Sequence, residues 1–384
     1  MSQIRTAQSC ASEASAAASE FHRDLAGPDL SLVIFFCSCD YDLDVLSREF
    51  NRLFAGVRVI GCTTAGGYGP LGYREHTLTG VAFFGPDFLA VAGQLSLLPE
   101  FDPAAAQRKV QALRHELEAS APWVQSINTF ALQLIDGLSV KEEIVTRTVQ
   151  SALGAVFMIG GSAGDGLRFR RTHVFCDGEF HSGRAVVALI ATRLPFHLFM
   201  TQHFSPRDER MVVTRATESL RIVHELNGRP AAAEYARCAG VDSPDPALFS
   251  HIPVVVRLGG NHYVRSIQQV LPDGSLCFYC AIEQGMVLRL ARGEDLTRNL
   301  GEQFSRIEEA LGGPPQLVLG CDCILRRLEI QHTGLTEQID ALSRANNMVG
   351  FATYGEQYRG VHINQTLSGI AFGRKQGDDD ECQA

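Results

Sequence analysis

Apolar runs and glycine-rich turns follow one another along this chain in an order that occurs twice. An apolar run from Leu32 ends in Cys-x-Cys at Cys39, an amphipathic stretch follows, and a glycine-rich stretch occupies residues 59–85. The same order returns from Leu317 to residue 373. Continuous apolar runs are typical of strands covered on both faces, and a period of three to four residues is typical of helices. Each copy therefore predicts the order strand, helix, strand, turn, strand.

The two glycine-rich stretches align at a constant spacing. Gly61 stands 289 residues before Gly350. Thr64 stands at the same distance before Thr353, and a fainter third copy spans residues 130–190. A repeat of such length indicates duplicated half-domains, because solenoid units are about 20 to 50 residues long. We predict a duplicated α+β fold in which layered mixed and antiparallel sheets pack against helices, with a pseudo-twofold relation between the copies.

Helix and turn signals support this order. Asp40 or Asp42 caps a helix that runs to Phe54, and Asp102 before Pro103 starts another helix. The strands at residues 78–84 and 88–95 predict a hairpin that turns at residues 85–87. The glycines favour tight turns over phosphate binding, because neither a P-loop Lys-Ser/Thr nor G-x-G-x-x-G spacing accompanies them.

A turn at residues 225–231, which contains Asn-Gly and a proline, separates two halves of the chain. The strands around it read as antiparallel, with Gly-Gly and Asp-Gly turns. The predicted parts are a lead-in at 1–29, an N-terminal domain at 30–224, a C-terminal domain at 225–373 and an acidic disordered tail at 374–384.

Composition places the chain among ordinary globular proteins with room to bury a cofactor. Of its 384 residues 45% are hydrophobic and 20% are charged, and the formal net charge is −9. Without a cluster of Lys and Arg, nucleic acid and anionic membranes are not expected partners. No apolar run approaches the ~20 residues of a membrane span, and Glu13 and Glu20 interrupt the Ala-rich start, which does not read as a secretory signal. We expect a cytoplasmic protein.

The eleven cysteines are expected to be reduced, and most of them to fill the core. If the repeat brings the two Cys-x-Cys pairs together, Cys37 and Cys39 with Cys321 and Cys323 offer ligands for zinc or an iron–sulfur cluster. A reactive or redox-sensing thiol among Cys37, Cys62, Cys321 and Cys323 is an equally open interpretation.

Among the twelve histidines, His203 has the most suggestive context. Alternation over residues 196–204 places it on one face of a strand with aromatic and polar neighbours. This suits a haem or metal ligand, and the plainer alternative is a strand histidine whose ring is satisfied by its neighbours. His362 and His181 are the next candidates. The residues expected to line a haem pocket are Phe199, Thr201 and Gln202. No G-x-S-x-G or H-E-x-x-H motif supports catalysis, so we expect no enzyme activity.

Several short stretches carry a resemblance to a known family: Gly61-Cys62-Thr63-Thr64-Ala65-Gly66, Thr201-Gln202-His203-Phe204, Asn227-Gly228-Arg229-Pro230-Ala231, Cys321-Asp322-Cys323 and Asn364-Gln365-Thr366. Together with their neighbours they span residues 30–372. On these residues the chain resembles the FIST family of bacterial sensory domains, in particular its haem-containing, nitric-oxide-sensing members. The resemblance implies FIST N and FIST C regions that join near residues 223–227.

The resemblance also implies a function. A chain of this kind is a non-enzymatic input module that binds haem b, senses nitric oxide and regulates a histidine kinase or a cyclic-di-GMP enzyme, that is, a diguanylate cyclase or a phosphodiesterase. Its iron would be held by a neutral imidazole, with His203 as first candidate. A homodimer is compatible with this reading. The alternative is a FIST receptor for a small molecule, or a thiol or metal redox receptor, without haem.

Overall fold

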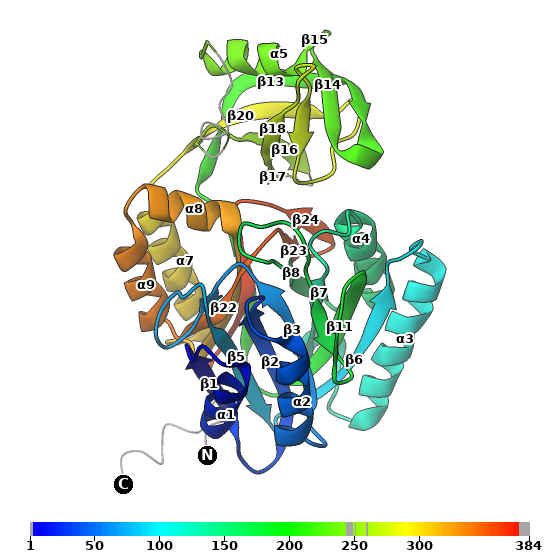
Figure 1. Cartoon of the computed structure of the whole chain (residues 1–384), viewed down its shortest axis with the longest axis vertical. Helices are drawn as coiled ribbons and strands as arrows, with labels where there is room; N and C mark the ends of the chain where they lie inside the picture. Colours follow the sequence, from blue (N-terminus) through cyan, green and yellow to red (C-terminus); the bar gives the residue numbers. More distant parts are fainter. Residues whose placement is uncertain (1–2, 243–248, 250, 259, 376–384) are drawn as a thin grey trace.

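The structure, a computed structural model, describes residues 3–242, 249, 251–258 and 260–375. Figure 1 shows two parts, a lower body and an upper layer of strands. The upper layer comprises the described residues between 204 and 293, and the body comprises the described residues on either side. None of the described helices is long and apolar enough to cross a membrane. Of the predicted acidic tail, residues 376–384 lie outside the described residues.

The first copy of the repeat folds around one central strand. This strand pairs parallel with the strand that follows the helix and antiparallel with the last strand of the copy. Asp42 caps the helix by accepting a hydrogen bond from the Val45 backbone N–H, as the sequence predicts. The elements in chain order are β2 (Leu30–Ser38), α2 (Leu43–Leu53), β3 (Arg58–Thr64) and β5 (Leu78–Phe84).

The second and third copies repeat this pairing. The predicted duplicated α+β architecture is confirmed, and the faint third copy proves to be a complete unit of the same topology. The second copy consists of β21 (Leu317–Cys323), α8 (Ile324–His332), α9 (Thr336–Ala345), β22 (Met348–Thr353) and β25 (Leu367–Phe372). The third consists of β7 (Thr129–Ile135), α4 (Glu142–Leu153), β8 (Met158–Ser162) and β11 (Arg184–Thr192).

Close approach of neighbouring strands explains the repeated glycines. In the second copy Gly350 lies opposite Gly320, and a Cβ on Gly350 would stand 1.9 Å from the Gly320 carbonyl oxygen. In the first copy a Cβ on Gly61 would stand 2.5 Å from the Phe35 carbonyl oxygen. No heavy-atom contact of this kind is tolerated, so only glycine fits at these register positions. The glycines shape the sheets, as expected, although here by close packing rather than by a turn.

The predicted hairpin at residues 78–95 is wrong. The second of its strands, β6 (Phe88–Ser96), pairs with β11 of the third copy and not with β5. The reason is that β5 is already bonded on both edges, to β2 and to β1 (Ile4–Ser9). The described part of the lead-in therefore belongs to the body, because β1 completes the first sheet and α1 (Ala14–Leu25) buries Phe21 against it.

The three copies exchange strands in a cycle. A short strand of the first copy joins the sheet of the second copy, a hairpin of the second joins the third, and a hairpin of the third joins the first. The exchanged strands are β4 (Gly67–Tyr68), β23 (Glu356–Tyr358) with β24 (Val361–Ile363), and β9 (Val174–Cys176) with β10 (Glu179–His181). With β12 (Phe196–Thr201), the three sheets are ordered β1-β5-β2-β3-β9-β10, β12-β25-β21-β22-β4 and β24-β23-β8-β7-β11-β6.

The inner faces of the three sheets meet in one core. Phe36 of the first copy stacks on Phe351 of the second with ring centroids 4.2 Å apart, and Leu134 of the third lies in the same cluster. Backbone hydrogen bonds also join the ends of the second strands, from Ala65 N to Ala352 O and from Gly164 N to Thr63 O. Helices cover the outer faces, among them α3 (Pro103–Ser120) and α7 (Leu296–Leu311), and α3 begins at the predicted Asp102-Pro103 signal.

The upper layer is an antiparallel sheet inserted between β12 (Phe196–Thr201) and α7. The chain enters it at Phe204 and leaves it at Gly293, and these two residues pair with each other. The predicted boundary between residues 224 and 225 lies inside β14. The elements of the layer are β13 (Phe204–Thr217), β14 (Ile222–Leu226), β15 (Arg229–Pro230), α5 (Ala231–Ala239), β16 (Val254–Leu258), β17 (Asn261–Arg265), β18 (Ile267–Val270), β19 (Leu276–Phe278) and β20 (Val287–Gly293). Two 3-10 turns complete the structure, η1 (Ser126–Asn128) and η2 (Glu218–Leu220).

Candidate functional site

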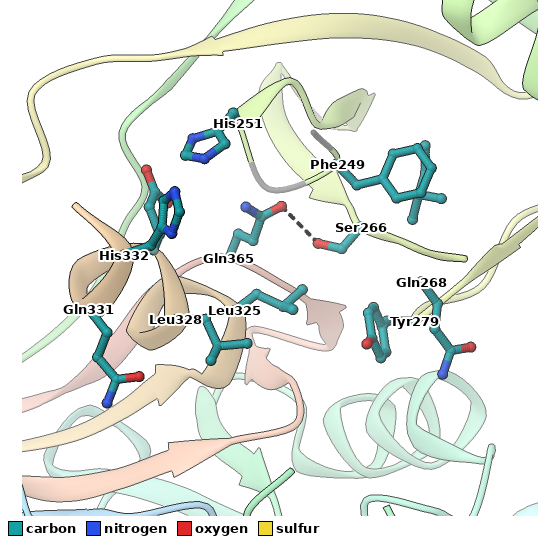
Figure 2. A pocket seen from close by; sticks show the side chains of 12 residues that line it. Phe249, His251, Ser266, Gln268, Tyr279, Leu325, Leu328, Gln331, His332 and Gln365 are labelled. Atoms are coloured by element: carbon teal, nitrogen blue, oxygen red, sulfur yellow. Dashed lines mark hydrogen bonds between the residues drawn. The ribbon is translucent and has the colours of Figure 1, made fainter. Parts of the chain in front are cut away.

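A cavity of 580 Å³ lies where the upper layer meets the body, and we call it the junction cavity (Figure 2). One wall comes from α8, and the facing wall comes from the segment before β16 and from the strands around β18 and β19. Ser266 Oγ, on the upper layer, donates a hydrogen bond of 3.0 Å to Gln365 Oε1 of the body. The cavity is therefore bounded by both parts of the molecule.

Two smaller cavities continue the junction cavity on either side. A cavity of 270 Å³ shares Leu328 and Gln331 with it and reaches Cys39, which follows β2, and Arg168, which lies between β8 and β9. A cavity of 180 Å³ shares Tyr279 with it and extends to α4. These cavities lie at the carboxyl ends of the parallel strands. Open α/β sheets bind their ligands at the same end of the strands.

The junction cavity is mainly apolar and carries few charged groups. Its walls include Leu325 and Leu328 of α8, Phe249 and Ile267 on the facing side, and the ring of Tyr279. His251 and His332 stand at the exposed mouth with ring centroids 5.8 Å apart. Glu329 brings one acidic side chain, and no Lys or Arg lines the cavity within the described part of the chain.

Glu329 is bonded to His203, the first candidate from the sequence. His203 Nε2 lies 2.8 Å from Glu329 Oε1, and both side chains are buried. The other carboxyl oxygen, Oε2, has no hydrogen-bond partner among the described residues. His203 also packs on Phe204, with ring centroids 4.2 Å apart, and its carbonyl accepts from the Glu294 backbone N–H. His203 thus links α8 to the strands that enter and leave the upper layer.

The other two candidate histidines lie elsewhere. His362 on β24 is buried beside the 180 Å³ cavity, with Nδ1 3.2 Å from Gln357 Nε2, and burial lowers its pKa to about 4, which leaves the ring neutral at pH 7. His181 lies on the β9–β10 hairpin, 3.6 Å from Glu179. The three histidines belong to three different sheets or their ends, and the fold does not bring them together.

The three expected haem-pocket residues pack toward α7. Phe199 lies in the core of the second copy, and Thr201 Oγ1 donates to Asn299 Oδ1 at 2.9 Å. Gln202 Oε1 accepts from the Phe204 backbone N–H at 2.7 Å. None of them lines the three cavities described above.

The four candidate cysteines are fully buried. Cys62 and Cys321 lie in the central core, Cys37 lies under α2, and Cys323 caps α8. Burial is the main cause that raises the pKa of each thiol, so none is activated as a thiolate. Within the residues that the structure describes, no group of three or more His, Cys, Asp or Glu is arranged to hold a metal ion, and the cysteines are free.

A buried charged cluster joins the upper layer to the body beside α4, which Figure 1 places across the junction from α8. Arg221 donates to Glu142 at 2.5 Å and to Glu143 at 2.7 Å, and also to the Tyr279 carbonyl. Burial raises the pKa of Glu142 to about 7, although the positive charge of Arg221 opposes the shift.

The sequence analysis missed both Glu329 and this cluster. Cys321-Asp322-Cys323 is part of the resemblance, but Glu329 lies six residues further on, in α8. Its burial depends on an upper layer that local periodicity does not reveal.

Comparison with known proteins gives a family. Residues 31–229 match the family model described as the FIST N domain, and residues 231–359 match the model described as the FIST C domain. No curated protein matches the chain. A solved structure titled "Cyanuric acid hydrolase: evolutionary innovation by structural concatenation" aligns with 97% of this chain and 99% of its own, at 9% identity and a TM-score of 0.35. That likeness is too low to carry an argument.

Proposed function

This chain belongs to the FIST family, and on that premise we propose that it is a non-enzymatic sensor whose small ligand binds in the junction cavity. FIST domains are sensory domains of signal transduction that bind small ligands. The observation that carries the proposal is the cavity itself. Its 580 Å³ falls within the roughly 300–1,000 Å³ of small-molecule sites, and it combines apolar walls with a few polar groups.

The position of the cavity supports a signalling role. A ligand there touches α8 and the upper layer at once, and the chain enters and leaves the upper layer side by side, at the paired residues Phe204 and Gly293. A ligand that binds one arrangement of the two parts more tightly shifts the population toward it. We propose a histidine kinase, or a diguanylate cyclase or phosphodiesterase, as the partner that reads this arrangement. The resemblance seen in the sequence supports that choice of partner.

A cavity-filling variant tests the site. Compounds that raise the melting temperature of the wild type should lose this effect in Leu325→Trp, because the indole occupies their volume. Ile127→Trp is the matched control, since Ile127 is 85% exposed on the body. Compounds that stabilise Leu325→Trp as well as the wild type would place the ligand elsewhere.

We also propose, more specifically, that the bound group is haem b and that the sensed molecule is nitric oxide. The resemblance at residues 201–204 and 321–327 supports this. The described side chains do not fit the group as they stand. His203 is bonded to Glu329 and His362 to Gln357, and no Lys or Arg of the described cavity lining meets the two propionates. When bound, haem would supply an iron that takes nitric oxide.

Haem reconstitution tests whether the protein binds haem. If haem is the cofactor, the wild type develops a Soret band and a ferrous nitrosyl spectrum, and His203→Ala or His362→Ala loses them. His332→Ala tests the mouth of the junction cavity in the same assay. Failure of the wild type to take up haem rejects the haem form and leaves the small-ligand sensor standing. Metal analysis of the purified protein tests the metal form of the redox alternative, which requires bound zinc or iron, and thiol titration tests its thiol form.

A further inference from the structure

We propose that the ligand of the junction cavity is an organic cation, a protonated amine or amidine on an apolar body. This inference rests on the proposed function for the location of the site. It adds the chemical class of the ligand, which neither the family nor the sequence assigns.

The charge of the lining gives the first argument. Glu329 supplies an acidic group, and Lys and Arg are absent from the lining within the described residues. Of the two arginines next to it on α8, Arg326 donates to Asp322 at 2.7 Å and Arg327 stacks on the ring of Tyr73. Phosphate and carboxylate ligands need a positive partner to offset their desolvation, and the described lining offers no Lys or Arg for this. A cation meets its counter-charge in Glu329.

The bonding of Glu329 gives the second argument. The residue is only 9% exposed, and one of its oxygens is bonded to His203 while Oε2 has no partner among the described residues. An ionised carboxyl group accepts hydrogen bonds only, with about four acceptor sites on its two oxygens. A buried acceptor without a partner is unfavourable, and a donor from a ligand relieves it. The nitrogen of an amine or amidine is such a donor.

The remaining walls indicate the rest of the ligand. Leu325 and Leu328 lie across the cavity from Phe249, and the Tyr279 ring lies at its edge (Figure 2). Ile267 of the upper layer also lines the cavity. These surfaces favour an apolar, preferably aromatic, body. The described walls therefore surround a hydrophobic volume with one acidic position, Glu329.

Three probes with one body and different charge test the class. They are 4-phenylbenzamidine, 4-phenylbenzamide and 4-phenylbenzoate, which are cationic, neutral and anionic at pH 7.5. In calorimetric titration of the full chain, we expect the amidine to bind at least about tenfold more tightly than the amide, because a hydrogen bond to a charged group adds to the shared apolar contacts. The benzoate should bind least.

Variants assign the preference to residues. Glu329→Gln should lower the affinity for the amidine about tenfold and leave the amide within about twofold. Glu302→Gln on α7 removes the same charge from an exposed position and should change neither affinity. Leu325→Trp should remove binding of all three probes. Circular dichroism checks that each variant is folded, and if Glu329→Gln is not, the order of the three probes on the wild type still decides.

The outcomes separate the two proposals. Equal binding of the three probes, lost in Leu325→Trp, overturns the cationic class and keeps the junction cavity as the ligand site. Binding that survives in Leu325→Trp overturns the site as well. An amidine preference unchanged in Glu329→Gln overturns the role of that residue, and no binding of any probe to the wild type overturns the cationic class.

Discussion

Arg221 is the residue whose loss should matter most at the contact between the two parts. Its guanidinium is bonded to the buried Glu142 and to Glu143, and removing one partner of a buried ion pair leaves an uncompensated charge. We predict that Arg221→Met lowers the free energy of unfolding by about 3–5 kcal/mol at pH 8. Arg215→Met on the same layer, which breaks an exposed pair with Glu225, should cost less than about 1 kcal/mol.

The stability lost in Arg221→Met should be larger at high pH than at low pH. Since burial raises the pKa of Glu142 to about 7 from its usual 4.5, its protonated form is favoured in the fold, and its contribution to stability is present at pH 4.5 and lost as the pH rises through 7. Removing Arg221 strengthens this trend. Urea unfolding at pH 5 and pH 8 should therefore show the larger loss at pH 8, and Glu142→Gln in the same chain should restore part of it. An equal loss at both values contradicts the assignment.

Thiol labelling should divide the cysteines by burial. We predict that Cys10, which is exposed, and Cys39, which is half-buried, react with iodoacetamide in the folded protein. The buried Cys37, Cys62, Cys321 and Cys323 should remain unlabelled until the chain unfolds, because burial both covers the sulfur and raises its pKa. Peptide mass mapping measures this residue by residue. Labelling of Cys62 in the folded state would contradict this prediction and support the interpretation of Cys62 as a sensing thiol.

At the scale of single residues, the sequence predicts which face of a strand a side chain lies on better than it predicts which side chain bonds to it. Alternation along residues 196–204 correctly separated the face of Phe196 from that of Phe199, which lie in different clusters. The bond between His203 and Glu329 spans 126 residues and depends on how α8 meets the inserted layer. No local pattern contains that information, so the histidine was found without its carboxyl partner.

At the scale of elements, the glycines of the repeat provide a direct test. We predict that Gly350→Ala destabilises the protein by at least about 1–3 kcal/mol, because the added carbon would stand 1.9 Å from the carbonyl of the next strand. Gly301 lies inside α7 with nothing within 4 Å of an added Cβ. Gly301→Ala should therefore stabilise by about 0.5–1 kcal/mol. Thermal unfolding of both variants measures the contrast, and a stable Gly350→Ala would argue against the register described for β21 and β22.

Helix starts and strand positions follow from the sequence because their causes are local. Asp42 and Asp102 cap the helices that follow them, as predicted. The hairpin at residues 78–95 failed because strand pairing depends on which edges are free, and both edges of β5 were taken by β1 and β2. Sequence proximity is a weaker guide to pairing than edge availability.

At the scale of the molecule, the internal repeat revealed the copies but not their exchange of strands. Alignment along the chain finds segments that resemble one another, whereas the exchange joins segments that differ. The same limit applies to the upper layer. Its strands were recognised as antiparallel, but its status as an insertion between β12 and α7 rests on the pairing of Phe204 with Gly293, which lie far apart in sequence.

Ligand binding at the junction should be detectable across both parts. Because the cavity is lined by α8 and by the segments around β18 and β19, we predict that 4-phenylbenzamidine slows amide hydrogen exchange in these elements together. Exchange in β6, which lies at the far edge of its sheet, should not change. Protection confined to one side of the junction would mean that the ligand does not bridge the two parts.

The cyclic exchange of strands also determines when the protein finishes folding during its synthesis. The sheet of the third copy is incomplete until β23 and β24 have been synthesised, and among the described strands β12 pairs only with β25, at residues 367–372. A nascent chain thus carries open strand edges until β25 has left the ribosome, and such edges favour association with other chains. Loss of the segment from β23 to β25 would leave the sheets of the second and third copies unfinished at once, whereas the first sheet already has all its strands at β10.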